Sequence, residues 1–416
     1  MRKIFQLLVL ATSWFACSNT LAQVQPVVLV LKGAAVTDGT GTDVQVVGNL
    51  LYLAWSGDTN HPGGLEIFSI TNPNAPTRIS GYESRAPVNA IYVANGYAYL
   101  ALNTAQTYTN DAGALEIVDV RDPGNPIRLS SINTAGRAND IRVSGNYAYV
   151  PESLRWTGSN LLGGLEILDV STPTNPVRVA AFGTAGSATS VDVSGSYAFL
   201  ADGVTDLQVL DVSNPEKPQV VGIFISDVSQ NHCGFEPGGP ANLVTVHGEL
   251  LYSAGENGVH VLDVSEPSNP RTIGDNFCFP SYGFQVSGHY AFSMVWFQAD
   301  NAFRLRILDA TEPANLAGIG WQENWSRAFC IVDRFIYSAR GNLLAAYEIT
   351  DVPPIRSISR SGNSLVLTWN PVPGFRLQRT DSLDDPVWCD IPDSEGLGQI
   401  ELPITTNNGF FRLARP

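Results

Sequence analysis

The stretch GGLEILDVSTPTNPVRVAAFG, from Gly163 to Gly183, is the clearest copy of a line that recurs along most of the chain. Strong copies are GGLEIFSITNPNAPTRI from Gly63, GALEIVDVRDPGNPIRL from Gly113, LQVLDVSNPEKPQVV from Leu207 and VHVLDVSEPSNPRTI from Val259. Weaker copies at Leu305 and Leu344 bring the number to seven. Each begins with a nearly continuous apolar run of β-forming residues, which is typical of a strand buried on both faces. A proline-containing turn and another apolar run follow, so each copy predicts two strands.

Two more strands precede each copy. The segment ANDIRVSGNYAYVPE, residues 138–152, alternates apolar and polar residues on both sides of a Gly145-Asn146 turn, as a β-hairpin does. Its closing aromatic recurs at spacings of 40 to 53 residues, as Tyr52, Tyr99, Tyr149, Phe199, Tyr252, Phe292 and Tyr337. Four strands per repeat of this length are typical of a β-propeller blade. The predicted fold is all-β, a seven-bladed propeller over residues 23–352.

The last repeat has no fourth strand of its own. The segment from Gln25 to Gly33 aligns with the fourth strand of the third repeat, so we expect residues 27–31 to pair with residues 343–349 and to complete blade 7. Such an exchange removes an exposed strand edge.

An aspartate ends the third strand in five repeats, at Asp119, Asp169, Asp211, Asp263 and Asp309. Its carboxylate is placed to accept backbone N–H groups of the following turn. Repetition in five blades favours this structural role over a catalytic one.

The strings LEIVDV, LEILDV, LQVLDV and VHVLDV, each followed by a turn of the form S/R-x-P-x-x-P, resemble the LVIVD repeat of exported bacterial β-propellers. The resemblance covers roughly residues 26–350. It implies the propeller fold and an exported or surface location, and it brings no catalytic residues.

The N-terminus has the pattern of a secretory signal. Arg2 and Lys3 precede an apolar run from Ile4 to Ala16, and a small-residue site at residues 20–22 predicts cleavage before Gln23. Lipidation at Cys17 is the alternative. No later apolar run reaches the roughly 18 residues of a membrane span. We therefore expect a secreted, periplasmic or cell-surface protein that is monomeric.

Net charge and cysteine spacing limit which partners, disulfides and cofactors are expected. Loss of the signal would change the formal net charge from −15 to −17, which disfavours nucleic acid. Of the remaining cysteines, Cys233 and Cys278 lie in comparable loops and form the candidate disulfide, while the spacing shows no zinc or redox motif. No cofactor or metal is expected.

From Pro353 the repeats stop, and residues 353–416 show short strand patterns separated by Gly, Pro and Asn. This predicts a small β-sandwich with Trp369 and Trp388 in its core. The segment resembles the fibronectin type III-like modules of exported bacterial proteins.

The connections opposite the short hairpin turns are long and differ in every blade, and binding residues concentrate in such loops. Aromatic residues map to this face: Trp55, Tyr108, Trp156, Tyr282, Trp296, Trp321 and Trp325. These rings either bind a protein or a glycan, or pack the loops themselves.

The first strand of each blade lines the channel, and the aligned residues near its entry are Thr42, Asn89, Asn139, Thr189, Asn242, Tyr282 and Arg327. They either hold a small polar ligand or anion, or cap strand ends.

Two functions remain open. The first is a non-enzymatic scaffold that binds a protein or a glycan through the loop face. The second is a glycan-active hydrolase or lyase with carboxylates from Asp58, Asp111, Glu236 and Glu323 on the same face. Glu66, Glu116 and Glu166 lie one blade apart and are not an acid/base pair. His61 and His232 form only a weak metal signal.

Overall fold

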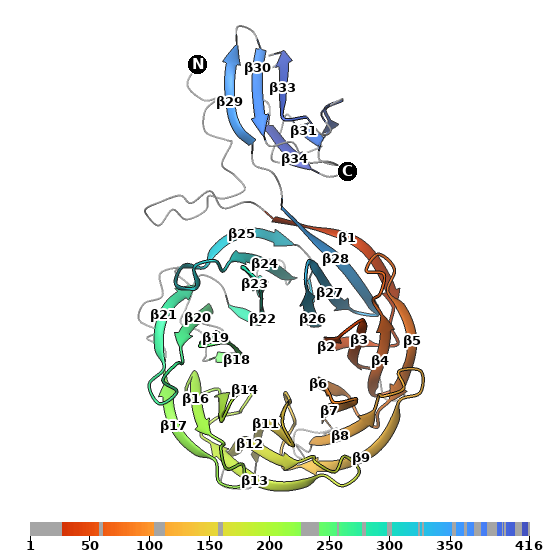
Figure 1. Ribbon diagram of the computed structural model, residues 1–416, viewed down its shortest axis with the longest axis vertical. Coiled ribbons are helices and arrows are strands. Elements are labelled where there is room, and N and C mark those ends of the chain that lie inside the picture. The colour runs from red at the N-terminus through yellow and green to blue at the C-terminus, as the bar shows by residue number, and fades with distance from the viewer. Residues whose placement is uncertain are drawn as a thin grey trace. The chain divides into compact units, whose positions relative to one another are not determined.

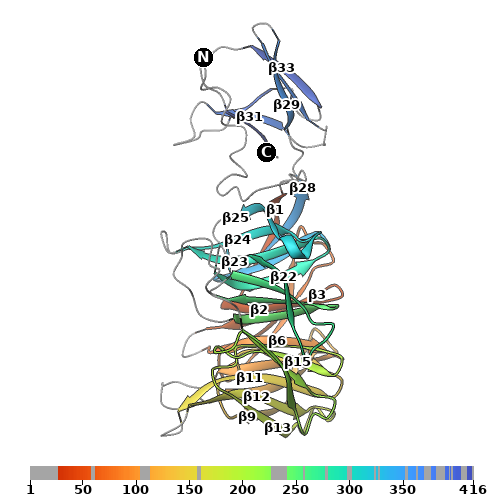
Figure 2. The same cartoon turned by 90° about the vertical axis from the view of Figure 1, so that its left-hand side faces the viewer.

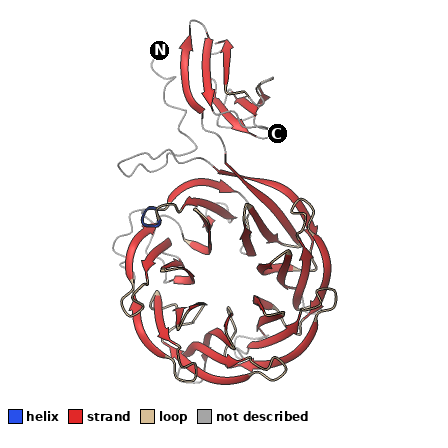
Figure 3. Cartoon of the chain, viewed as in Figure 1, coloured by secondary structure: helices blue, strands red, loops and turns tan. Residues whose placement is uncertain are grey.

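The computed structural model describes residues 27–57, 61–103, 113–156, 161–225, 241–255, 258–276, 280–297, 302–322, 325–326, 328–351, 355–361, 364–369, 376–380, 389–392, 394, 397–403 and 410–414. Seven four-stranded sheets form a closed ring (Figure 1). Strands account for nearly all of its regular structure (Figure 3). Figure 2 shows the same ring edge-on.

The first four blades follow one another along the chain. Blade 1 contains β2 (Thr40–Val47), β3 (Leu50–Ser56), β4 (Gly63–Ser69) and β5 (Thr77–Glu83). Blade 2 contains β6 (Val88–Ala94), β7 (Tyr97–Asn103), β8 (Gly113–Asp119) and β9 (Ile127–Thr134). Blade 3 contains β10 (Arg142–Ser144), β11 (Tyr147–Trp156), β12 (Leu161–Asp169) and β13 (Val177–Thr184). Blade 4 contains β14 (Ser190–Ser194), β15 (Tyr197–Ala201), β16 (Leu207–Asp211) and β17 (Gln219–Phe224).

Three more blades complete the ring. Blade 5 contains β18 (Ala241–His247), β19 (Leu250–Gly255), β20 (Gly258–Asp263) and β21 (Arg271–Asn276). Blade 6 contains β22 (Ser281–Ser287), β23 (Tyr290–Phe297), β24 (Ala302–Asp309) and β25 (Ala317–Gln322), with the short 3-10 helix η2 (Pro313–Asn315) before β25. Blade 7 contains β26 (Ala328–Val332), β27 (Phe335–Arg340), β28 (Leu343–Asp351) and β1 (Val27–Val36).

The first strand of the chain is thus the outer strand of blade 7. It continues five residues beyond the predicted Leu31, and an ion pair between Lys32 and Glu348 at 2.8 Å lies across its pairing with β28. The N–H group of Thr37 donates to the carbonyl of Asn342 at 2.9 Å. These contacts fix the strand to the blade that the chain forms last.

The hydrophobic core lies between adjacent blades. The described side chains of the third strands in blades 1 to 5 are almost fully buried, as in β8, where only Asp119 is partly exposed. One face of β8 contributes Leu115 and Ile117 to a cluster with blade 3, and the other contributes Val118 to a cluster with blade 1. No blade could therefore bury both faces alone, which explains the repetition in the sequence.

The five aspartates that end third strands cap the following turn, as predicted. Asp169 Oδ1 accepts the N–H group of Ser171 at 2.8 Å. The other four aspartates accept the N–H group of the residue two positions later in the same way. The pairs are Asp119 with Arg121, Asp211 with Ser213, Asp263 with Ser265, and Asp309 with Thr311. In blade 1, where Ser69 replaces the aspartate, the bond to the N–H group of Thr71 is longer, at 3.5 Å.

The C-terminal residues form two three-stranded sheets. One contains β29 (Ile355–Ser361), β30 (Ser364–Trp369) and β33 (Gln399–Pro403), and the other contains β32 (Cys389–Asp390), β31 (Arg376–Thr380) and β34 (Phe410–Ala414). A hydrophobic cluster centred on Leu367 and Leu377 draws residues from both sheets. The side chains of Trp369 and Trp388 lie outside the described residues.

Candidate functional site

The two ends of the ring are built differently. The turn between the first and second strands has two residues in every blade, and the first of them has a positive φ: Gly48, Asn95, Gly145, Gly195, Gly248, Gly288 and Asp333. We call this side the turn end. On the opposite side, the loop end, the connection between the second and third strands ranges from residues 341–342 in blade 7 to residues 104–112 in blade 2. Only the loop end varies from blade to blade.

Several predicted site residues belong to loop-end segments outside the described residues. They are Tyr108, Arg327, Asp58, Asp111, Glu236, Glu323, His232, Cys233 and Cys278, together with the side chain of Trp156.

Two of the predicted tryptophans are core residues. Trp55 is 4% exposed, and Gly39 and Gly64 lie directly against its ring, where a Cβ atom would come within 2.4 and 3.0 Å. Trp325 is 5% exposed and its ring lies 4.9 Å from that of Tyr347. These rings pack the loop end itself, which is the second of the two interpretations that the sequence left open. Trp321, at the end of β25, is 43% exposed.

Blade 6 brings two predicted residues together. The rings of Tyr282 and Trp296 both contact Phe303, with centroids 6.0 and 4.5 Å away, and all three side chains are partly exposed. We call these three residues the aromatic cluster. Phe303 was not predicted because the repeat was taken to begin at Leu305, whereas β24 begins at Ala302. The alternation of Phe303, Leu305 and Ile307 was the available signal.

The predicted ring of channel-entry residues joins neighbouring blades. Thr42 Oγ1 donates to the carbonyl of Val88 at 2.7 Å. Asn89 and Asn139 repeat the contact with the carbonyls of Ala138 and Ala188, at 2.8 and 2.6 Å. The repeat breaks in blade 4, where Thr189 reaches Ala201 of its own blade at 3.5 Å. For Asn242, the described contacts include no such bond.

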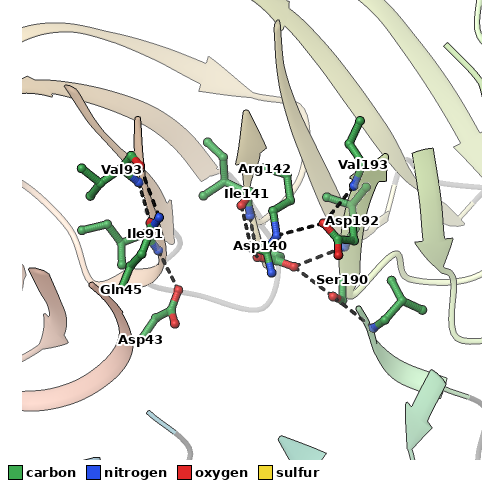
Figure 4. A network of polar contacts seen from close by, with 12 residues as sticks. Asp43, Gln45, Ile91, Val93, Asp140, Ile141, Arg142, Ser190, Asp192 and Val193 are labelled. Carbon is green, nitrogen blue, oxygen red and sulfur yellow. Dashed lines mark hydrogen bonds and ion pairs between the residues drawn. The ribbon is translucent and has the colours of Figure 1, made fainter. Parts of the chain in front are cut away.

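A second network lines the channel one and three residues further along the chain from these positions (Figure 4). The free edge of each innermost strand faces the channel, so its backbone groups need partners. Asp43 accepts the N–H group of Ile91 at 2.9 Å, and Gln45 exchanges two bonds with Val93. Asp192 likewise accepts the N–H group of Val246 at 2.7 Å. Side chains of one blade thus satisfy the backbone of the next.

Arg142 balances the charge of this network. Its guanidinium lies 3.1 Å from Asp140 and 3.5 Å from Asp192, and it covers the ring of Tyr92 at 5.9 Å. Burial raises the pKa of Asp43 to about 6, although the hydrogen bond from Ile91 acts in the opposite direction. Asp43, Gln45, Asp140 and Asp192 are therefore engaged in holding neighbouring blades together.

The residue that follows the first buried leucine or valine of the third strand is polar and buried in five blades: Glu66, Glu116, Glu166, Gln208 and His260. In blade 6 it is the partly exposed Arg306. In blades 1 to 3 the glutamate is paired with an arginine on the fourth strand. The Glu66–Arg78 and Glu166–Arg178 pairs have N···O distances of 2.7 and 2.9 Å. These glutamates stabilise blades, in agreement with their exclusion as an acid/base pair.

Glu166 also meets a second carboxyl that the sequence analysis missed. Glu152, in β11, is 6% exposed, and Glu166 is 2% exposed. The Oε1 atoms of both residues accept the N–H group of Ala135, at 3.1 and 3.2 Å. Burial, and then the charge of Glu166, raises the pKa of Glu152 to about 8, although hydrogen bonds from the N–H groups of Gly136 and Ala135 act in the opposite direction.

Blade 4 has the same pair of positions with different chemistry. Asp202 corresponds to Glu152 and Gln208 to Glu166, and Gln208 Nε2 donates to Asp202 Oδ2. Asp202 Oδ1 accepts the N–H groups of Val204 and Thr205, at 3.0 and 2.6 Å. Blade 4 thus has one carboxyl and one carboxamide where blade 3 has two carboxyls.

No group of three metal-ligating side chains occurs among the described residues. His61 lies 3.1 Å from Glu83 in an exposed pair. In blade 5, Ser253 is directly opposite His260, but both are buried in the sheet, which keeps them from a substrate.

No helix in the described part of the chain is long and apolar enough to cross a membrane.

Comparison with known proteins agrees with this architecture. The LVIVD repeat model matches residues 135–184, 185–225 and 238–275, which contain blades 3, 4 and 5. No curated protein sequence matches the chain.

Two solved structures are similar in fold. A proposed 6-phosphogluconolactonase from Bacteroides uniformis ATCC 8492 has a TM-score of 0.56 at 13% identity and covers 88% of this chain and 100% of its own. Another from Bacteroides fragilis NCTC 9343 has a TM-score of 0.54 at 12% identity, over 95% of this chain and 100% of its own. Such identities establish the fold alone. The chain is thus an all-β, seven-bladed propeller that contains LVIVD repeats.

Proposed function

We propose that this protein is a non-enzymatic binding scaffold that recognises a protein or a glycan through the loop end of its propeller. The observation that carries the proposal is the contrast between the two ends of the ring. All seven turns at one end have two residues with a positive φ at the first, while the connections between second and third strands at the other end range from two to nine residues. A rigid scaffold with one variable end is a common way to present a binding surface.

The aromatic cluster supplies a starting point for such a surface. Tyr282, Trp296 and Phe303 are partly exposed and come from three strands of one blade, so their geometry is held by the sheet rather than by a loop. Aromatic rings held in this way stack on sugar rings and anchor protein partners with little loss of conformational entropy.

The test is a glycan-array screen of the purified protein, followed by titration of the best ligand against Trp296→Ala and His289→Ala. His289 is the exposed second residue of the turn of blade 6 and serves as the matched control. We expect at least tenfold weaker binding for Trp296→Ala and no change for His289→Ala, with both variants retaining the circular dichroism spectrum. Loss of binding only with the turn-end variant would refute the proposal.

A polysaccharide-degradation assay on the same protein separates binding from catalysis. Cleavage that a single substitution among Asp58, Asp111, Glu236 and Glu323 abolishes would replace the scaffold by a glycan-active hydrolase or lyase. Binding without cleavage would support the scaffold.

The proposed setting is outside the cytoplasm. The basic start, apolar run and small-residue site of residues 1–22 support export, with cleavage before Gln23. N-terminal sequencing of the protein from its native host should begin at Gln23. A lipid on Cys17 would instead indicate membrane anchoring.

Residues 353–416 are proposed to be a separate β-sandwich module, similar to fibronectin type III, that spaces or attaches the propeller. The hydrophobic cluster shared by two small sheets supports this assignment. Limited proteolysis of the full chain should cut near residue 353 and release both fragments intact.

A further inference from the structure

The outer strand of blade 4, β17, differs from the outer strands of the three blades before it. In blades 1 to 3 the second residue of the outer strand is an arginine that pairs with the buried glutamate of the third strand. A small residue lies directly opposite that glutamate, at Gly81, Ser131 and Ala181. It leaves room for the guanidinium, since a Cβ atom on Gly81 would come within 2.6 Å of Arg78 Nη2.

In blade 4 both of these positions are apolar. Val220 replaces the arginine, opposite Leu210, and Ile223 replaces the small residue, opposite Gln208. Val220 and Ile223 are 40% and 53% exposed, and Ile225, directly after the strand, is 66% exposed. We call Val220, Ile223 and Ile225 the apolar strip.

The strand that carries the apolar strip is packed on its other face. Leu210, opposite Val220, belongs to the hydrophobic cluster between blades 3 and 4, so Val220 is on the face toward blade 3. On the opposite face, Gly222 lies against the turn of blade 5, where a Cβ atom would come within 2.3 Å of the carbonyl oxygen of Pro267. Contact with blade 5 therefore holds β17 in place and leaves the strip exposed.

The edge of β17 is open and uncharged. β17 is the last strand of its sheet, at the perimeter of the ring (Figure 1), and residues 219–224 include no charged side chain. Charged residues on an edge strand hinder the addition of a further strand. Five other outer strands each carry a basic residue: Arg78, Arg128, Arg178, Arg271 and Lys32. The outer strand of blade 6 is also uncharged, but its Ile319 is buried. Among the described outer strands, an uncharged edge and an exposed apolar strip coincide only in blade 4.

We propose that β17 is a docking edge for an extended segment of another protein, with apolar residues at alternate positions and basic residues at its ends. The added strand would form backbone hydrogen bonds along β17, while its apolar side chains contact the apolar strip. Basic ends are favoured because the formal net charge of the chain is −15 and β17 itself is neutral. This edge is independent of the aromatic cluster in blade 6.

A second copy of the chain fits the edge less well. Two chains with a formal net charge of −15 repel each other. The edge has only 6 residues, whereas a specific protein interface has about 20 residues on each side. A short segment needs no more than the edge of one strand, so it is the occupant that the charge and the size favour.

The test uses the fluorescein-labelled peptide Lys-Val-Thr-Val-Thr-Val-Lys, titrated against the full-length protein by fluorescence anisotropy. Ile223→Ala, which copies Ala181 of blade 3, should weaken binding about tenfold, and the further change Val220→Arg should weaken it more. The matched control is Ile127→Ala, since Ile127 is 52% exposed on an outer strand that carries Arg128. It should leave binding unchanged, and all variants should keep the circular dichroism spectrum because the altered side chains are exposed.

Two modified peptides separate strand addition from non-specific apolar contact. Methylation of alternate backbone nitrogens, made in both alternating sets, removes N–H donors and keeps the side chains, so one set should abolish binding. Replacement of both lysines by glutamate should weaken binding about tenfold at low salt. Hydrogen exchange with the original peptide bound should slow the amides of β17 and leave those of β9 unchanged.

Equal binding of both methylated peptides, or exchange in β17 that the bound peptide does not slow, would overturn the proposal. Dimers of the unliganded protein in sedimentation velocity that Ile223→Ala abolishes would also overturn it, because the apolar strip would then be an interface between two copies of the chain.

Discussion

Blades 3 and 4 use equivalent positions to solve the same problem with different groups. Blade 3 places Glu152 beside Glu166 and adds Arg178 on its outer strand, whereas blade 4 places Asp202 beside Gln208 and has Val220 where the arginine would be. The exchange of a carboxyl for a carboxamide thus accompanies the loss of the cation. We infer that these buried groups act as a set, so changing one member alone should be costly.

The largest effect is expected when blade 4 receives the second carboxyl of blade 3 without the arginine that accompanies it there. Gln208→Glu would place a second carboxyl beside the fully buried Asp202, and Val220 stands where blade 3 has Arg178. We expect the free energy of unfolding at pH 7.5 to fall by about 3 kcal/mol, measured by urea denaturation.

The matched rescue is the double variant Gln208→Glu with Val220→Arg, which copies the position of Arg178. It should recover more than half of the loss. If Gln208→Glu alone left stability unchanged, the two blades would not differ in the way described.

Removing the cation from blade 3 should have a smaller effect. Arg178→Val leaves Glu166 buried without its ion pair, but the arginine is 41% exposed, so solvent already screens part of the interaction. We expect a loss of about 2 kcal/mol at pH 7.5. Adding Glu166→Gln should restore most of it, because the blade then has the blade 4 pattern; additive losses in this double variant would contradict the comparison.

The next largest effect is expected in the pH dependence of the free energy of unfolding, to which Glu152 of blade 3 contributes. Glu152 has a pKa above its usual value in the folded protein, so the folded state binds a proton that the unfolded state releases. Stability therefore falls as pH rises from the ordinary glutamate range toward about 8. Between pH 6.5 and 7.5 wild type should lose up to about 1.4 kcal/mol relative to Glu152→Gln, measured by urea denaturation at both values. A constant difference between the two proteins would show that Glu152 carries no extra proton.

The turn caps should show the smallest effect and no difference between the blades. Asp169→Ala removes a bond to Ser171, and we expect a loss of about 1 kcal/mol at pH 7. Asp211→Ala should destabilise in the same direction. The hydrogen bond to Ser171 lowers the pKa of Asp169, so its contribution should disappear only at acid pH, as thermal unfolding from pH 7 to pH 2 would show. An effect in one blade only would mean that the caps also differ.

The repeat architecture could be predicted from the sequence because each blade repeats the same requirements. The apolar third strand must be buried on both faces, and its closing aspartate must cap a turn, so the strand and the aspartate reappear together in successive repeats. The strand that completes blade 7 could be aligned for the same reason, although its continuation to Val36 has no counterpart in β13.

The loop end was less predictable because its residues do not repeat. Trp55 and Trp296 look alike in the sequence, and only packing against Gly39 and Gly64 distinguishes the buried ring from the partly exposed one. The Glu152–Glu166 pair was missed because Glu152 has no equivalent acid in blades 1 and 2, where Trp55 and Leu102 occupy its position. A comparison with Asp202 and Gln208 in blade 4 would have revealed it.

The location of β1 in blade 7 has a consequence for the order in which the protein is made. During synthesis this strand emerges first, yet its partner β28 follows about 300 residues later, so it must wait while six other sheets assemble. While the chain is still on the ribosome, β1 therefore has no partner strand. Its pairing with β28 in blade 7 is the step that closes the propeller.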